Sequence, residues 1–205
     1  MKTFVSLCAL ALLTNSAFAQ SSNFTGLSIG VGMAYSQTKV TEKDPGNSGY
    51  SWNNGDTLPQ LNITYNFALS DRWLVGLGAS YNLNRQDAGT SRGASDLVRT
   101  NLDDHSSVYL QPTFALDDRS AIYAKVAYHS LRVETVPVGS SNWNPDRFRT
   151  NGLGYGVGYT RLFGKHVFAQ GEVQTVTYDN KLLPGNVRYT GPDETIALIT
   201  LGYKF

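Results

Sequence analysis

Cysteine, charge and long apolar runs are all scarce in this 205-residue chain. Its single cysteine excludes a disulfide framework and a cysteine-based zinc site. Charged residues make up 16% of the chain, whereas soluble domains carry about 25%. The formal net charge of +1 lacks the basic excess of a nucleic-acid-binding protein. Beyond residue 20 no apolar run approaches the roughly 20 residues of a membrane helix. Glycine and tyrosine are plentiful instead, with 20 and 12 copies.

Residues 1–19 have the organisation of a cleaved secretory signal peptide. Lys2 supplies the positive start, residues 4–13 form an apolar core, and Ala17-Phe18-Ala19 is an A-x-A cleavage site. The core has only about ten residues, too few for a transmembrane anchor. Cleavage starts the mature chain at Gln20, without cysteine and with equal numbers of acidic and basic residues.

The rest of the chain alternates between apolar and polar or small residues with the period of two that predicts β-strands. In the first segment Leu27, Ile29 and Val31 fall on one face, and glycine and serine fall on the other. The pattern occurs eight times, with apolar faces over residues 27–35, 59–67, 73–83, 108–114, 122–128, 153–159, 167–173 and 197–205.

Two all-β architectures fit this alternation. A secreted sandwich or lipocalin-like barrel buries its apolar face, whereas a transmembrane barrel turns that face to lipid. Runs of Gly, Ser, Asn and Gln on the opposite face suit a narrow lumen and favour the membrane barrel. Because lipid cannot satisfy an exposed strand edge, the sheet must close. The expected fold is an all-β, eight-stranded antiparallel transmembrane up-and-down barrel over residues 20–205.

Aromatic side chains on the apolar faces gather at two levels, like the aromatic girdles of membrane barrels. One level holds Phe67, Trp73 and Phe114, and the other holds Tyr35, Tyr81 and Tyr128. The eight steps from Trp73 to Tyr81 span about 20 Å of depth at roughly 3.3 Å per residue and 40° tilt. That depth is close to the roughly 25 Å apolar band of membrane barrels.

Short and long connections alternate along the chain. Short turns lie near residues 70–72, 117–119 and 164–166, and loops rich in Gly, Asn, Asp, Ser and Pro cover about 41–57, 85–106, 135–151 and 179–194. Both termini fall on the side of the short turns. In outer-membrane barrels this side is periplasmic and the long loops are external. We therefore expect periplasmic termini.

The final residues, Leu201-Gly202-Tyr203-Lys204-Phe205, resemble the C-terminal signature of bacterial outer-membrane barrels. In that class the barrel-assembly machinery reads the terminal Phe and the alternating apolar residues, here Leu201, Tyr203 and Phe205. With the signal peptide and strand count, the mature chain resembles the small eight-stranded proteins of the OmpA/OmpX and opacity-protein type. The resemblance implies a monomer in a Gram-negative outer membrane, in contact with its lipid and lipopolysaccharide and without a cofactor.

Histidines are the candidates for catalysis, because some small outer-membrane barrels modify lipid A with a His and a Ser. The expected deacylase pattern, His-x-Ser on one face, is absent, since His129 directly precedes Ser130. We expect His129 to point inward and His166 to lie in a solvated turn. We place His105 in an external loop, where it could share a cation site with Asp103-Asp104. No phosphate loop, nucleophile elbow or metal-ligand spacing is present, so lipid A modification is the least favoured function.

Lys125 and Glu172 are expected to meet inside the lumen. Each lies six residues after the end of a short turn, so both point inward at similar depth. An isolated charge in a narrow barrel is unfavourable, which predicts an ion pair or a network shared with Gln60, Asn62, Gln111 and Gln170. Such a network would plug the barrel; the alternative is a gate in a narrow channel for ions or small solutes.

The loops hold the remaining candidates for binding, which are Tyr50, Trp52, Trp143, Phe148, Arg147 and Arg149. Exposed aromatic and Arg side chains are typical of binding surfaces, and Arg near the outer leaflet can pair with lipopolysaccharide phosphates. A plain hydrophilic shield is the alternative. The leading hypothesis is a non-enzymatic surface protein that supports envelope integrity or binds an extracellular ligand through its loops. The second is the narrow channel.

Overall fold

The structure is a computed structural model that describes residues 21–43, 50–92, 97–139, 146–182 and 188–205. The predicted signal peptide and Trp143 lie outside the described residues, as do the side chains of Tyr50 and Trp52. In the described part of the chain, no helix has the length and apolar character needed to cross a membrane.

The described residues form ten strands and one short 3-10 helix, η2. These are η2 (Ser21–Phe24), β1 (Gly26–Lys43), β2 (Tyr50–Ala68), β3 (Trp73–Asn82), β4 (Gln86–Arg92), β5 (Leu97–Ala115), β6 (Ser120–Val138), β7 (Asp146–Phe163), β8 (Val167–Tyr178), β9 (Lys181–Leu182) and β10 (Arg188–Lys204). Neighbours pair antiparallel in the order β1-β2-β3-β5-β6-β7-β8-β10, and β1 also pairs with β10. The sheet is therefore closed. Because β4 extends the line of β3 along β5, and β9 extends that of β8 along β10, the described strands make eight staves of one barrel.

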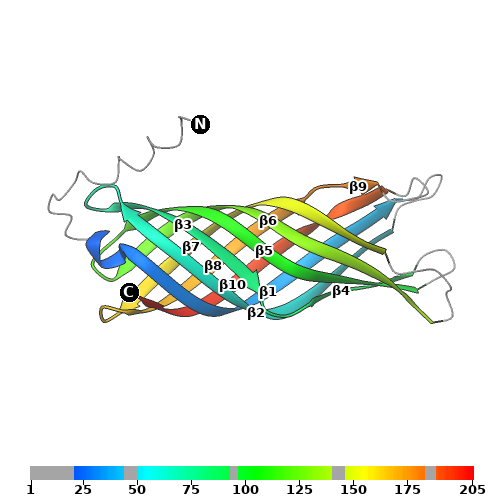
Figure 1. Cartoon of the computed structure of the whole chain (residues 1–205), viewed down its shortest axis with the longest axis horizontal. Helices are drawn as coiled ribbons and strands as arrows, with labels where there is room; N and C mark the ends of the chain where they lie inside the picture. Colours follow the sequence, from blue (N-terminus) through cyan, green and yellow to red (C-terminus); the bar gives the residue numbers. More distant parts are fainter. Residues whose placement is uncertain (1–20, 44–49, 93–96, 140–145, 183–187) are drawn as a thin grey trace, which may run out of the picture.

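The two ends of the barrel differ. Figure 1 shows η2 and the C-terminus at the same end, where the short connections 69–72, 116–119 and 164–166 also lie. We call this the terminal end and the opposite one the loop end. The closed eight-stranded antiparallel barrel predicted from the alternation is confirmed.

The outside of the barrel is apolar over its middle. Val31, Leu77 and Ile199 are 55%, 53% and 70% exposed, whereas alternate residues such as Ala34 and Gln60 are buried. The aromatic residues predicted at two levels all point outward. Phe67, Trp73 and Phe114 lie toward the terminal end, where the rings of Trp73 and Phe114 are 4.9 Å apart; Tyr35, Tyr81 and Tyr128 lie toward the loop end.

The strands extend further toward the loop end than the predicted loop boundaries allow. Residues 41–43, 50–57, 97–106, 135–138, 146–151 and 188–194 lie in strands. At this level of the barrel the inner face is no longer mainly polar, because apolar side chains such as Val40, Leu102 and Leu131 point inward and are buried. An outer face that is no longer apolar does not show the alternation typical of lipid-facing strands, so the sequence pattern predicts loops in these segments.

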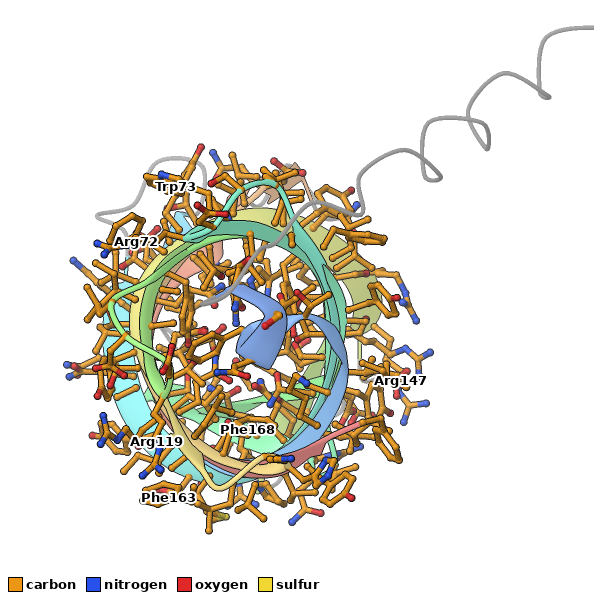
Figure 2. All side chains as sticks on the ribbon, turned by 90° about the vertical axis from the view of Figure 1, so that its left-hand side faces the viewer. Arg72, Trp73, Arg119, Arg147, Phe163 and Phe168 are labelled. Carbon is orange, nitrogen blue, oxygen red and sulfur yellow. The ribbon has the colours of Figure 1, made fainter. Side chains whose placement is uncertain are left out.

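The lumen is filled in three layers. An apolar cluster at the terminal end comprises Phe24, Leu74, Ala115, Ala121, Leu162 and Phe168. Polar side chains fill the middle, and a second apolar cluster, which includes Val40, Leu102, Leu131, Val133, Val176 and Leu198, lies toward the loop end. Figure 2 looks into the terminal end, with Phe168 inside the wall and Phe163 outside it.

Helix η2 closes the mouth at the terminal end. Figure 2 shows it turned into the opening of the barrel. Asn66 Nδ2 donates to the Phe24 carbonyl over 3.1 Å, and the Ser21 amide donates to the Asp71 carbonyl over 2.9 Å. These bonds hold the Phe24 ring in the apolar cluster, where the residue is 4% exposed.

Candidate functional site

A buried ion pair lies in the middle of the lumen. Lys125 Nζ pairs with Glu172 Oε2, and the two side chains are 5% and 3% exposed. They reach each other across β7, because this strand presents Gly156 beside Lys125 and Gly158 beside Glu172. A Cβ at Gly158 would overlap the Tyr123 ring, so glycine is needed for this packing.

Two tyrosines complete the surroundings of the ion pair. Lys125 Nζ lies 4.2 Å from the centroid of the Tyr109 ring, a cation–π contact. Tyr123 Oη donates to Glu172 Oε2 over 2.8 Å, and Gln170 Nε2 donates in turn to Tyr123 Oη. The pair is therefore desolvated but well provided with polar and aromatic partners.

The four amide side chains expected around this pair lie in three different places in the lumen. Gln170 joins the pair through Tyr123, while Gln60 Nε2 donates to Asn82 Oδ1 over 2.8 Å in a separate group. Asn62 and Gln111 line a cavity of about 40 Å³. Both have side-chain atoms without a hydrogen-bond partner among the described residues, and a polar cavity of this size has room for about one or two water molecules.

A second buried polar group, which the sequence did not reveal, lies nearer the loop end. His105 Nε2 is 3.0 Å from His129 Nδ1 and 2.9 Å from Tyr178 Oη. Asn82 Nδ2 contacts His105 Nδ1 over 3.1 Å, and His129 Nε2 contacts the Gln174 amide. These contacts connect β3, β5, β6 and β8 across the lumen.

The prediction that His105 lies in an external loop was wrong, because it belongs to β5 and is 5% exposed. The β5–β6 register shifts between Asp103 and Ser106, and Asp104 has a φ of 51°. This β-bulge places Asp103 and Asp104 both on the outer side, whereas His105 keeps the inward direction of Ser107 and Tyr109. His105 is thereby separated from the two carboxylates, and the cation site considered from the sequence does not form among them.

Glu194 is the acceptor at the centre of this second group. Its Oε1 accepts from Ser36, Thr38 and Gln86, and its Oε2 accepts from Tyr178 Oη over 3.0 Å. Glu194 is 1% exposed, and charge-assisted hydrogen bonds of this kind satisfy a buried carboxylate. We call His105, His129, Tyr178 and Glu194 the histidine–glutamate network.

Outside the barrel, charged side chains form a belt just beyond Tyr81 and Tyr128. The arginine belt comprises Arg85, Asp103, Asp104, Arg132, Glu134, Arg147 and Arg149. Tyr81 Oη donates to Asp104 Oδ1 over 3.5 Å, and Arg132 lies about 10 Å beyond Tyr128 at four residues of tilted strand. The belt therefore begins where the apolar band ends.

The arginines of the belt are paired and still accessible. Arg132 Nη2 and Arg149 Nη2 both approach Asp104 Oδ2, at 2.9 and 3.7 Å. Glu134, 5% exposed, lies between Arg85 and Arg147. The side chains of the four arginines are 43–65% exposed, and Figure 2 shows Arg147 projecting from the wall.

The closed barrel and its apolar outer face now have a counterpart among known proteins. The family model described as outer membrane protein beta-barrel domain matches residues 5–205. The chain belongs to this family. It is therefore a β-barrel of the bacterial outer membrane, as the terminal motif and strand pattern predicted.

Solved barrels of the same size support the fold. The attachment invasion locus protein Ail of Yersinia pestis is 17% identical, with a TM-score of 0.51 over 88% of this chain and 99% of its own. OprG of Pseudomonas aeruginosa is 16% identical, with a TM-score of 0.58 over 88% and 96%. Neisserial surface protein A is 9% identical, with a TM-score of 0.55 over 88% and 98%. No curated protein matches the sequence.

The other predicted site residues lie as follows. Leu201, Tyr203 and Phe205 are 64%, 46% and 64% exposed on the outer face, and His166, in the turn before β8, stacks on Tyr203 at 5.2 Å. Phe148, expected as a loop contact, packs against the inner apolar cluster instead. Within the described residues, no group of three His, Cys, Asp or Glu side chains is placed to bind a metal ion.

Proposed function

We propose that this outer-membrane barrel is a non-enzymatic protein that acts through its outer surface, with the arginine belt bound to lipopolysaccharide phosphates. In this arrangement the terminal end faces the periplasm, and the loop end projects beyond the outer leaflet, where it meets extracellular ligands. The observation that carries the proposal is the belt, which places four partly exposed arginines at one edge of the apolar band.

Arg132 and Arg149 are the centre of the proposed phosphate site. They face each other on β6 and β7, and Asp104 is the carboxylate that both approach. One carboxylate between two guanidinium groups leaves N–H donors for a further anion, and Arg binds phosphate in a bidentate manner. A lipid A phosphate would complete the charge balance of this pair.

The filled lumen supports an outer rather than an inner site of action. Two apolar clusters and two polar networks occupy the interior. This is expected, because an eight-stranded barrel is narrow enough for side chains to fill its interior. The binding of a polyanion to the outer surface of this barrel is consistent with a sulfated ligand that is bound by a barrel of similar fold. Ail was crystallised in complex with the heparin analogue sucrose octasulfate, although the likeness to Ail extends to the fold alone.

The test is lipopolysaccharide binding by the refolded mature protein. An exposed ion pair contributes about 0.2–1 kcal/mol, so Arg132→Gln/Arg149→Gln should weaken binding by about tenfold if together they contribute about 1.4 kcal/mol. The matched control is Arg72→Gln/Lys165→Gln, which removes the same charge at the terminal end. It should bind as the wild type does.

Salt provides a second readout. Because the belt is exposed, wild-type affinity should fall as ionic strength rises, and the Arg132/Arg149 variant should show a weaker dependence. Equal affinities for the wild type, the belt variant and the control would exclude the belt as the binding site.

A further inference from the structure

A groove is cut into the apolar outer surface near the terminal end. It has a volume of about 680 Å³ and crosses β3, β5, β6, β7 and β8. Large side chains edge it on the terminal side: Trp73, Phe114, Ile122 and Tyr159. Residues with short or compact side chains make the hollow: Gly171 in the same row, and Pro112 and Ala124 in the next one.

The register explains why the surface is hollow here. Trp73, Phe114, Ile122 and Tyr159 are successive cross-strand partners, and this row continues to Gly171 on β8. Ala124 pairs with Val157 in the next row. A Cβ built at Gly171 meets no atom within 4 Å, so glycine leaves an opening at this point on the outer face.

Charges of both signs lie at the terminal edge of the groove. Arg161 follows Tyr159 on the outer face of β7; its guanidinium contacts Ser120 Oγ and lies 3.9 Å from Asp117 Oδ2. Both side chains remain accessible, at 43% and 59% exposed. The backbone N–H of Arg119 donates to Asp117 Oδ1 over 2.7 Å. Hydrogen bonds from Arg119 and Ser120 hold the pKa of Asp117 below its ordinary value, so this carboxyl stays ionised at neutral pH.

We propose that the groove and the Arg161–Asp117 pair bind a zwitterionic glycerophospholipid, with an acyl chain in the groove, the phosphate at Arg161 and the ammonium at Asp117. The volume lies in the range of about 300–1,000 Å³ that ligand pockets occupy. The lining is apolar, while the edge offers one cation and one anion side by side. The proposal rests on the proposed orientation, in which this edge lies in the periplasmic leaflet, where glycerophospholipids are the lipids.

Native mass spectrometry of the refolded mature barrel, titrated with phosphatidylethanolamine or phosphatidylglycerol, tests the acyl-chain site. Gly171→Leu fills the groove from a position with open space, so the barrel should fold. Its phosphatidylethanolamine affinity should fall about tenfold, the effect of losing contact with roughly two methylene groups. Ala79→Leu places the same leucine side chain on the outer face of β3, away from the groove, and should leave the affinity unchanged.

Two further variants test the headgroup assignment. Arg161→Gln should lower the affinity for both lipids by about fivefold, an upper estimate for the loss of one exposed ion pair. Asp117→Asn should lower the affinity for phosphatidylethanolamine only, because phosphatidylglycerol has no ammonium. If the wild type, Gly171→Leu and Ala79→Leu retain phosphatidylethanolamine equally, the lipid binds non-specifically around the barrel, and the proposal is overturned. A phosphatidylglycerol affinity equal to that of phosphatidylethanolamine in the wild type would overturn the zwitterionic assignment.

The same experiment separates this proposal from the proposed function. Binding to the isolated barrel does not depend on its orientation in the cell, and the arginine belt lies at the other end. If the wild-type barrel binds lipopolysaccharide through the belt but shows no dependence of lipid binding on the groove residues, only the groove proposal is refuted. The reverse result would refute the belt alone.

Discussion

Breaking the Lys125–Glu172 pair from one side should destabilise the barrel strongly. Glu172→Gln leaves the ammonium of Lys125 buried at 5% exposure, and removing one partner of a buried ion pair costs about 3–5 kcal/mol. The Tyr109 ring, 4.2 Å from Lys125 Nζ, remains in place and offsets about 1–2 kcal/mol of that cost. The net loss should be about 2–3 kcal/mol. Lys125→Met, which leaves Glu172 with only its Tyr123 hydrogen bond among the contacts described, should cost at least as much.

The double variant Lys125→Met/Glu172→Gln removes both charges and should lose less than either single variant. Urea unfolding of the refolded protein in vesicles, followed by tryptophan fluorescence and by heat-modifiable migration in gels, gives the three free energies. The coupling energy should exceed about 1.5 kcal/mol, since residues in one buried network are strongly non-additive. Additive losses, or single variants within 0.5 kcal/mol of the wild type, the range of about ±0.5 kcal/mol for ordinary surface changes, would refute the buried pair.

Three further predictions concern the ends of the lumen. Glu194→Ala removes the acceptor of four donors and should lower the free energy of unfolding in urea by about 3 kcal/mol. Glu194→Gln keeps an acceptor oxygen and should lower it less. Equal losses for the two variants would contradict the network. Phe24→Ala should cost about 3 kcal/mol by opening a cavity, whereas Phe67→Ala, on the lipid face at 44% exposure, should cost clearly less in the same assay. Because Asn82 Nδ2 donates to His105 Nδ1, nitrogen NMR should find His105 protonated on Nε2 only; a protonated Nδ1 on this ring would contradict the contact with Asn82.

The barrel itself was predictable because its outer face is apolar over the membrane depth. A period of two then separates lipid-facing from lumen-facing residues without ambiguity, and it places Lys125, Glu172 and His129 inside. It also places Tyr109 and Tyr123 inside, as the residues between Val108 and Leu110 and between Ile122 and Ala124. The signal for these rings was the glycine facing each of them, at positions 78 and 158, but such pairs are visible only once strand register is known.

The histidine–glutamate network was hidden for two physical reasons. Alternation counted from Val108 would place His105 inside, but the predicted loop of residues 85–106 covers this residue. Just beyond it the bulge at Asp104 breaks the alternation, so that Asp103 and Asp104 both lie on the outer side. Glu194 lies where the outer face is polar and the inner face carries apolar residues such as Val40 and Val176 beside polar ones. In that region a charged residue is indistinguishable from a loop residue by composition alone. Phe148 was misassigned for the same reason.

Single-channel conductance tests whether the lumen is filled, which is the condition for a protein that acts from its outer surface. The refolded mature protein would be recorded in a planar bilayer beside Glu172→Gln, whose folding is verified by heat-modifiable migration. We expect no reproducible openings in the wild type, because apolar clusters close both ends of the polar middle layer. Discrete wild-type openings that Glu172→Gln enlarges or lengthens would show that the lumen conducts and would make the Lys125–Glu172 pair a gate.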